Sequence, residues 1–535
     1  MGVVFGEYVS REERIEKHPD IVKVQFLDKN EAVLTQSTVL GIEEGNATDF
    51  LYGQELKIKI FTKEVEEGTK INIKLKGKTK STNQTFPGIN TLNWELEVKN
   101  NKCETALFTL PMQWYSEEFE FYDYNSHTTN IKSEDLNAFM AEVTLLAKTA
   151  YLPTKENWLK PISYRRNYEE LIGLFNTNNS GEKDKERNYE NKFIASNSEI
   201  KTTVDAFIEK VITQGIKTSE IKTLVEEKAK SLWDAAIKQV QNGNLDDRPL
   251  YWARNKMQTW LKRNPLFKDQ IDFNKSIVKK GTELDSVIIT FEEKSRNYTG
   301  IDFSKAGNKK KVLITGFDPF QLDPEYYPFN HPSVGLETFN PSGILALTLN
   351  NNKLLNKNGI FIQTCIFPVR YNDFDNKVVE NTIAKYFDEV EIIMTTSRNN
   401  ATWDIEKYAI AYRGGFHDNM NIGNTNIKYD SSRFISNHSK DKTTTTLPQN
   451  KIFGVDNVKT QILGELIEYD QNSTDTMGSG SNYLSNEVMY RTTKFRDAKS
   501  SPKPVGHFHI KDLKSISKAD IVKNVTIQII KKIIL

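Results

Sequence analysis

The hydrophobic pattern of this 535-residue chain changes its period twice, so one pair of packed layers cannot accommodate the whole sequence. Between residues 20 and 125, apolar and polar side chains alternate in short runs separated by turn-forming stretches, among them IVKVQFL, ELKIKIFT, KINIKLKGK, LNWELEVK and ETALFTLP. This period of two predicts short strands with one solvated face. We therefore expect a β-sandwich of the immunoglobulin-like kind over residues 1–128.

From Ser133 onward the apolar spacing becomes helical. The first candidate helix, at 133–152, opens with a serine and acidic residues, as a helix start commonly does. Three further amphipathic segments lie at 198–215, 218–243 and 248–264, and a polar, charged stretch at 176–191 is expected to be a loop. The sequence thus predicts an α-helical region at 129–300.

The third pattern begins at KKKVLITGFDPF, residues 309–320, where basic residues lead into an apolar strand. Helical and strand-like stretches then alternate: SGILALTLNNNKLL, GIFIQTCIFPV, DFDNKVVENTIAKYF and EVEIIMTTS. Such alternation predicts an α/β domain over residues 301–535, with a mixed sheet flanked by helices. A site is expected in the loops after the strands.

Composition excludes several classes of function. The net charge of +1 argues against a dedicated nucleic-acid-binding protein. Cys103 and Cys365 lie far apart, so neither a disulfide framework nor a cysteine metal site is expected. The sequence contains no phosphate-binding glycine motif, and no cofactor is expected. No signal peptide and no apolar run long enough for membrane insertion were recognised. The expected location is cytoplasmic, or outside the cell by a signal-peptide-independent route.

Candidate catalytic residues lie in three separate segments. Ser485 follows a glycine- and serine-rich turn, in GSGSNYLSNEVMY, at the start of a helical run. Unpaired backbone N–H groups at such a junction favour a nucleophile, although serine is also a common helix cap. His509 shares a strand face with His507 in VGHFHI, and Glu406 follows the loop TTSRNNA.

Together, and in this order, these segments resemble the pyroglutamyl peptidases (pyrrolidone carboxyl peptidases), a family of cysteine peptidases. The resemblance covers residues 309–515 and includes KVLITGFDPF, NPSG, FPVRYNDFDNKVVENTI, DIEKYAIAYRGGFHDN, GSNYLSNEVMY and VGHFHI. It implies that His509 is the base and that Glu406 orients it. Ser485 takes the position of the family's cysteine nucleophile. The implied substrate is a peptide or small molecule with an N-terminal acyl or pyroglutamyl residue.

The resemblance also implies a substrate pocket. Phe317 and Phe320 match the aromatic residues that contact the lactam ring, Asn340 lies in NPSG, and Arg413 lies near the oxyanion-side arginine. The sequence departs from the family pattern in two ways. It contains two insertions, and it has TTSRNNA where the family has a glycine-rich loop with a lactam-binding glutamine.

Three interpretations stay open for Ser485: an adapted serine hydrolase, a catalytically silent binding protein, and an engineered inactivation of the nucleophile. In the second case the chain is an interaction module, and its N-terminal β module docks a protein partner. In one variant of this interpretation the protein is an exported effector.

Overall fold

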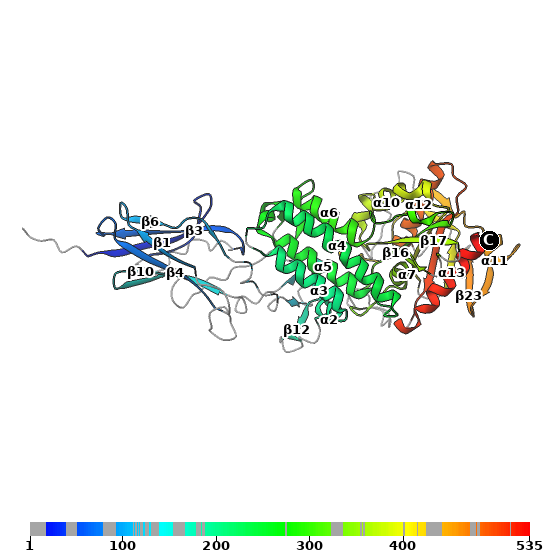
Figure 1. Ribbon diagram of the computed structural model, residues 1–535, viewed down its shortest axis with the longest axis horizontal. Helices are drawn as coiled ribbons and strands as arrows, with labels where there is room; N and C mark the ends of the chain where they lie inside the picture. Colours follow the sequence, from blue (N-terminus) through cyan, green and yellow to red (C-terminus); the bar gives the residue numbers. More distant parts are fainter. Residues whose placement is uncertain are drawn as a thin grey trace, which may run out of the picture. The chain divides into compact units, whose positions relative to one another are not determined.

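A computed structural model gives the structure of this chain (Figure 1). It divides into two compact units, residues 1–119 with 131–164, and residues 120–130 with 165–535. The residues that the structure describes are 18–38, 51–78, 92–110, 112, 115, 117, 121–123, 128–129, 138–152, 166–177, 183–184, 188–213, 215–272, 275–322, 335–353, 356, 359–399, 402–414, 416–423, 441–470, 478, 482–513 and 515–534.

Unit 1 contains two antiparallel sheets. The first joins β1 (Asp20–Asp28), β2 (Val33–Thr38), β3 (Glu55–Lys63), β6 (Lys102–Glu104) and β7 (Phe108–Thr109). The second has the order β11-β10-β4-β5, from β4 (Lys70–Lys78), β5 (Leu92–Glu97), β10 (Ala138–Leu145) and β11 (Lys148–Leu152). The rings of Phe26 and Phe139 meet edge to face at 5.7 Å, so the two sheets share a core. The immunoglobulin-like arrangement of these strands stays a prediction.

The helix predicted at 133–152 is wrong, because β10 and β11 occupy its described part. Alanine, methionine and leucine gave this stretch a helical composition, but Ala141, Val143 and Leu145 are all buried at a period of two. Pairing of β10 with β4 along its whole length satisfies the backbone and buries these side chains. The first part of the predicted helical region therefore belongs to unit 1.

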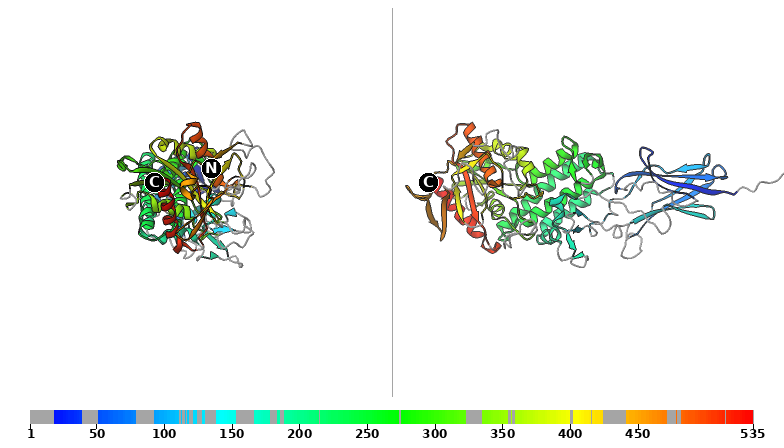
Figure 2. Two further views of the ribbon diagram at one scale, coloured as in Figure 1. Left: turned by 90° about the vertical axis from the view of Figure 1, so that its right-hand side faces the viewer. Right: turned by 180° about the vertical axis from the view of Figure 1, so that it is seen from behind.

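The helices of unit 2 begin with α1 (Tyr168–Leu171) and continue with α2 (Tyr189–Ala195), α3 (Ser198–Val211), α4 (Thr218–Gln241), α5 (Arg248–Arg263) and α6 (Glu283–Ser295). Helices α3 to α6 pack against one another as neighbours (Figure 2). They belong to the same compact unit as the α/β sheet, rather than to a separate domain ending at residue 300.

Short strands accompany these helices. Within the stretch 176–191, predicted as a polar loop, the described residues include parts of β12 (Phe175–Thr177), β13 (Lys183–Asp184) and α2. Strand β12 pairs with β8 (Phe121–Asp123), which in turn pairs with β9 (Thr128–Thr129).

A seven-stranded mixed sheet forms the centre of the α/β part, in the order β17-β16-β18-β24-β19-β23-β22. Strands β16 (Lys310–Phe317), β17 (Ile360–Phe367), β18 (Ile392–Asn399) and β24 (Val505–Lys511) run parallel. Strand β19 (Trp403–Glu406) is antiparallel to β24 and parallel to β23 (Glu465–Asp470), which pairs with β22 (Lys459–Ile462).

Helices cover this sheet on both faces. Helix α7 (Pro341–Leu349) packs on β16, β17 and β18, and the C-terminal helix α13 (Asp520–Ile534) packs against α7. Helices α10 (Val378–Tyr386) and α12 (Leu484–Ala498) share an apolar core with Phe317 on the other face. Gly316 contacts the start of α7, and because side chains alternate along a strand, Phe317 points the opposite way.

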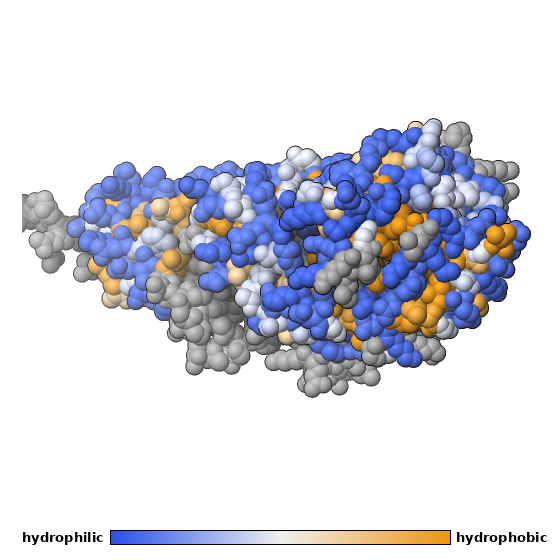
Figure 3. Space-filling model, turned by 45° about the vertical axis from the view of Figure 1, so that its right-hand side comes forward, coloured by the Kyte–Doolittle hydropathy of each residue, from blue (hydrophilic) through white to orange (hydrophobic). Residues whose placement is uncertain are grey.

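The surface of unit 2 is largely hydrophilic, with hydrophobic areas between the polar ones (Figure 3). Its exposed large apolar side chains include Val455, Leu463 and Leu466, which lie at and near the β22–β23 hairpin. Among the helices that the structure describes, none combines the length and hydrophobicity that crossing a bilayer requires.

Candidate active site

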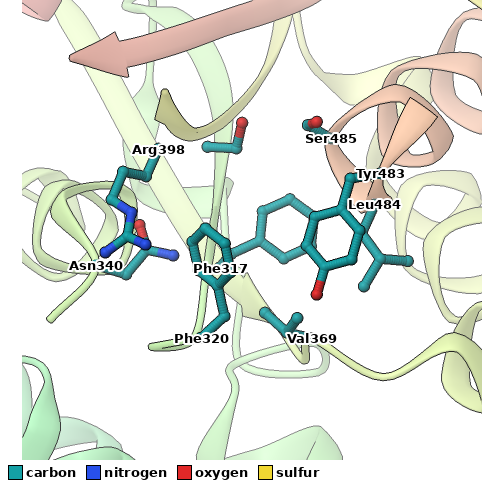
Figure 4. A pocket seen from close by; sticks show the side chains of 9 residues that line it. Phe317, Phe320, Asn340, Val369, Arg398, Tyr483, Leu484 and Ser485 are labelled. Atoms are coloured by element: carbon teal, nitrogen blue, oxygen red, sulfur yellow. The ribbon is translucent and has the colours of Figure 1, made fainter. Parts of the chain in front are cut away.

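A small cavity lies at the carboxyl ends of β16 and β18, beneath the start of α12 (Figure 4). It contains about 270 Å³ of empty space, part of it open to solvent. The lining residues are Phe317, Phe320, Asn340, Val369, Ser397, Arg398, Tyr483, Leu484 and Ser485.

Glu406 and His509 form a buried ion pair. Glu406 ends β19, and His509 lies on the neighbouring β24, where antiparallel pairing places Asp404 opposite His509. The distance between His509 Nδ1 and Glu406 Oε1 is 2.6 Å, and both side chains are 2% exposed. The ring nitrogen is close to the carboxylate oxygen but is not aligned with it as in a linear hydrogen bond, so the contact is chiefly electrostatic.

Burial lowers the pKa of His509, but the negative charge of Glu406, with smaller effects of Asp404 and Asp470, outweighs it and raises the pKa above the ordinary value. With Nδ1 held by Glu406, Nε2 is the ring nitrogen that can exchange a proton. The structure brings together these two residues, which the resemblance assigned to one site and which lie on different strands.

His507 lies beside this pair and differs from it electrostatically. Its ring meets that of His509 edge to face, with centroids 4.7 Å apart. Its Nδ1 lies 2.8 Å from Thr395 Oγ1, and its Nε2 lies 2.8 Å from Ser397 Oγ. Complete burial, and secondarily the charge of His509, hold the pKa of His507 well below its ordinary value. Of the two neighbouring imidazoles, His509 is thus biased toward its charged form and His507 toward its neutral form.

Ser485 lies in the first turn of α12, and its side chain lines the cavity. Tyr483 is the N-cap of this helix and makes no side-chain capping hydrogen bond. First-turn backbone N–H groups therefore remain for a bound anion, and the helix dipole favours negative charge there. Among the described residues, no hydrogen bond joins Ser485 Oγ to His509.

Phe317 and Phe320 provide apolar walls, as the sequence predicts. Phe317 stacks on Phe374 at 6.1 Å with nearly parallel rings, and this contact fixes its orientation. Phe320 contacts Tyr483 at 5.9 Å, and the Arg398 guanidinium lies 4.3 Å above its ring. A flat apolar ligand would find aromatic surface on several sides (Figure 4).

Asn340 lines the cavity, but its side chain also holds the local fold together. Its Oδ1 accepts hydrogen bonds from the backbone N–H and the hydroxyl of Ser342, as a helix N-cap does for α7. Its Nδ2 donates to the backbone oxygen of Asp318. The amide oxygen is therefore occupied, and Asn340 can offer a ligand only its second N–H.

Arg413 is not among the residues that line this cavity. Its guanidinium lies 2.6 Å from Glu487 in the first turn of α12 and 2.7 Å from Asp375, and it stacks over Tyr371. The oxyanion-side role that the resemblance implies for this residue stays a prediction. In this structure Arg413 orients the start of α12 through Glu487.

A buried charge cluster supports the cavity from the helical side. Asp318 stands in the sequence between the two phenylalanines that line the cavity. It accepts a hydrogen bond from Arg254 of α5, and a second one, at 2.6 Å, from Arg296 just after α6. The three side chains are at most 2% exposed. The helical region thereby fixes the end of β16, which carries Phe317, and the loop after it, which carries Phe320.

Ser397 and Arg398 were missed as site residues, although they lie in the TTSRNNA segment that departs from the family pattern. Ser397 is 6% exposed and so is Arg398, whose Nη2 lies 2.6 Å from Gln321 Oε1. The signal that could have identified Ser397 is the parallel pairing of β18 with β24, which brings Thr395 and Ser397 beside the two histidines.

Neither cysteine belongs to the site. Cys365 is buried within β17, where burial raises the pKa of its thiol, and Cys103 lies in unit 1. Within the described ranges, no group of three histidine, cysteine or acidic side chains is placed to hold a metal ion.

Comparisons with known proteins identify related sequences of unassigned activity. Models described as the PA0049 N-terminal domain and the PA0049 C-terminal domain match residues 176–272 and 311–456. Uncharacterized protein PA0049 of Pseudomonas aeruginosa is 28% identical over 226 residues, which are 38% of this chain and 38% of that protein. The matched segment thus spans well under half the length of this curated relative.

Two solved peptidase structures resemble part of this chain. A mutant pyrrolidone carboxyl peptidase from the hyperthermophile Pyrococcus furiosus shows 21% identity, with a TM-score of 0.31, over 42% of this chain and 98% of that one. Pyroglutamyl peptidase I from Bacillus amyloliquefaciens shows 20% identity, with a TM-score of 0.31, over 42% of this chain and 93% of that one. The likeness to each of these two structures thus covers less than half of this chain.

Proposed function

We propose that this chain is an amide hydrolase that removes an N-terminal acyl or pyroglutamyl residue by means of Ser485, His509 and Glu406. The observation that carries the proposal is the buried His509–Glu406 pair beside a small aromatic cavity that Ser485 lines. A base, a group that orients it, a hydroxyl and a helix N-terminus are the components that acyl transfer needs.

In the proposed reaction, the Ser485 oxygen attacks the acyl carbonyl carbon while its proton passes to His509 Nε2. The Glu406 carboxylate stabilises the imidazolium that forms. Negative charge on the carbonyl oxygen is stabilised by backbone N–H groups in the first turn of α12. When the C–N bond breaks, His509 returns the proton to the amine. Water, activated by His509, then hydrolyses the ester and frees Ser485.

Serine requires more of this site than cysteine would. A thiolate can form before substrate binds, whereas a hydroxyl loses its proton only during attack. Ser485 must therefore come within hydrogen-bond reach of Nε2 when substrate binds. Catalytic hydrogen bonds are often long in ligand-free enzymes and tighten in the complex.

The test is hydrolysis of pyroglutamyl-aminomethylcoumarin by the full chain and by three variants, Ser485→Ala, Ser485→Cys and His509→Ala. We expect release of the fluorophore by the wild type and its loss in the alanine form. His509→Ala should lower kcat/KM by roughly 10²–10⁴-fold, the usual contribution of a general base. Hydrolysis that persists in Ser485→Ala would contradict the assignment of the nucleophile.

The second candidate is a catalytically silent binding protein that uses the same cavity. It is favoured by the lack of a hydrogen bond between Ser485 and His509 among the described residues. In this case unit 1, proposed as a β-sandwich, would dock a protein partner, as in an exported effector. Failure of a fluorophosphonate to label Ser485, together with tight peptide binding, would favour this candidate. Silence of the wild type with activity in Ser485→Cys would indicate an intact pocket around a disabled nucleophile.

A further inference from the structure

One residue of the cavity wall carries a positive charge that the proposed reaction does not use. This residue is Arg398 of β18, which lines the cavity and is 6% exposed. Of the described residues that line the cavity, none is acidic. The carboxylates of Asp318 and Glu406 do not line it, and each already pairs with a basic side chain. Because a guanidinium stays protonated, the described wall of the cavity is cationic.

Two contacts fix the position of the Arg398 guanidinium. Its central carbon lies 4.3 Å from the centroid of the Phe320 ring, so the cation is stacked on an aromatic face. Its Nη2 donates a hydrogen bond to Gln321 Oε1 at 2.6 Å. Phe320 and Gln321 both belong to the loop after β16, whereas Arg398 belongs to β18. The arginine is thus held from a second element, and a group fixed in this way loses little freedom when a ligand binds.

The backbone of Gln321 is strained. Its φ is 60°, in the left-handed region that residues other than glycine rarely adopt. The residue is 8% exposed, and its backbone oxygen accepts a hydrogen bond from the N–H of Gly335 at 2.9 Å. Strain of this kind persists only where the surroundings enforce it, and it is concentrated at functional sites. Here the strained residue is the one whose side chain holds the cation of the cavity wall.

We propose that Arg398 recognises a carboxylate at the far end of the acyl group, so that the preferred substrate carries the acyl residue of a short dicarboxylic acid. Figure 4 shows the Arg398 guanidinium and Ser485 on opposite sides of the aromatic rings. An acyl group with its carbonyl carbon at Ser485 would extend along these rings toward Arg398. Arginine binds carboxylates through paired, charge-assisted hydrogen bonds, which are stronger than neutral ones.

A neutral acyl group, such as the lactam that the resemblance implies, would use this cation less well. It would cover the guanidinium without contributing an opposite charge, and a charge that loses contact with water is best compensated by one of opposite sign. Asn340 adds to the preference, because its oxygen is occupied by Ser342 and its remaining N–H can only donate. The inference rests on the proposed function for the position of the carbonyl carbon.

The experiment compares ligands that have the same shape and differ in charge. The full chain carrying Ser485→Ala is titrated by calorimetry with succinyl-, glutaryl- and adipoyl-alanine amide. Each is compared with an analogue in which a carboxamide replaces the terminal carboxylate. At the acyl length that reaches Arg398, we expect the carboxylate to bind about 10–100-fold tighter than its carboxamide, as hydrogen bonds to a charged group provide.

Variants of Arg398 identify the source of this preference. Arg398→Gln should abolish it and leave the affinity for the carboxamide nearly unchanged, which would show that the cavity is intact. Arg398→Lys should keep part of it, since lysine retains the charge but lacks the planar pair of donors. The matched control is Lys511→Gln. Lys511 is exposed, pairs with Asn399 next to Arg398 and does not line the cavity, so this variant should keep the full preference.

Equal affinity for carboxylate and carboxamide at all three lengths, with Arg398 intact, would overturn the inference, as would no binding of any ligand. A preference that persists in Arg398→Gln would overturn it as well, because another group would then bind the carboxylate. The two proposals fail separately, because binding is measured without turnover. An Arg398-dependent charge preference in a chain that hydrolyses neither pyroglutamyl- nor glutaryl-aminomethylcoumarin would support the inference and reject the hydrolase.

Discussion

His507 and His509 lie on one face of β24 and are set to different charge states by their neighbours. Glu406 favours the charged form of His509, whereas His507 is buried among hydroxyl groups that suit its neutral form. One strand can thus present two imidazoles with different charge preferences to the same region of the fold.

Replacing Glu406 with Gln should lower the pKa of His509. Burial lowers this pKa, and the negative charge of Glu406 would no longer counteract the effect of burial. In the wild type, the raised pKa stabilises the fold below the unfolded value of about 6.5, and this contribution disappears as the pH rises through the folded pKa. NMR titration of the His509 imidazole should report the shift. The stability difference between the two forms should be larger near about pH 5.5 than near about pH 8.5.

Activity gives a second measure of the same prediction. If His509 is the base, wild-type turnover should rise as the pH increases through its raised pKa. Glu406→Gln should lower kcat by a factor on the order of 10²–10⁴. The control is Glu465→Gln, since Glu465 accepts a hydrogen bond from Trp403 on the same sheet but is not part of the ion pair. An unchanged His509 titration in Glu406→Gln would refute the prediction.

The sequence could propose Glu406, His509 and Ser485 as one site, because each lies in a motif whose order along the chain is distinctive. It could not show that Ser397 lines the cavity. A lone serine in a strand has no sequence signature, and its position here depends on pairing with a strand more than a hundred positions away. The contact of Arg413 with Glu487 was not predicted either, because charge alone does not indicate whether a guanidinium faces a cavity or a carboxylate.

At the scale of elements, helices α5 and α6 are part of the scaffold of the site. Arg254 and Arg296 both contact Asp318, and Asp247, the N-cap of α5, accepts a hydrogen bond from the backbone N–H of Asn340. Burial raises the pKa of Asp247 well above its ordinary range. The start of α7 and the loop after β16 are therefore both anchored to the helical region.

Arg254→Met should destabilise the protein by roughly 3–5 kcal/mol, because removing one partner of a buried ion pair leaves the other inadequately compensated. Arg296 remains beside Asp318, which favours the lower end of this range. Urea unfolding followed by circular dichroism would measure the change. The matched control is Lys230→Met, since the pair of Lys230 with Asp234 is exposed and should contribute less than about 1 kcal/mol. Equal effects of the two substitutions would contradict the prediction.

Gly316→Ala should also destabilise this part of the fold. A Cβ atom at Gly316 would lie 2.2 Å from the backbone oxygen of Ser342 and 3.1 Å from the backbone nitrogen of Gly343. Backbone atoms cannot rotate away as a flexible side chain can, so α7 must shift as a whole. We expect a loss of roughly 1–3 kcal/mol, measured as a lower Tm, and weaker ligand binding through displacement of Asn340. An unchanged Tm would show that α7 does not pack so closely.

Strand and helix prediction succeeded where periodicity and composition agree, as in β16 and α4, and failed where they conflict. Residues 138–145 combine helix-forming alanine and methionine with an alternating pattern at Ala141, Val143 and Leu145. Only the presence of β4 as a partner decides between the two outcomes. The helices α6 and α13 and the β22–β23 hairpin were not predicted individually.

At the scale of the whole molecule, the chain passes between its two units more than once. After the first strands of unit 1, residues 120–130 contribute β8 and β9 to unit 2, and β10 and β11 then complete a sheet of unit 1. A boundary at residue 128 would consequently divide unit 1, because β4 would lose its pairing partner β10. Residue 165 is where the chain enters unit 2 for the last time.

This path leads to a prediction about fragments. A fragment of residues 165–535 retains all the cavity residues together with Glu406 and His509, and it lacks only β8 and β9 from unit 2. It should be monodisperse on size-exclusion chromatography and should release the fluorophore of pyroglutamyl-aminomethylcoumarin as fast as the full chain. A fragment of residues 129–535 carries β10 and β11 without β1 or β4. It would expose Phe139 and Met140 on a β10–β11 hairpin that has lost its partner strand β4, and it should aggregate. Lower activity in a folded 165–535 fragment would contradict the prediction.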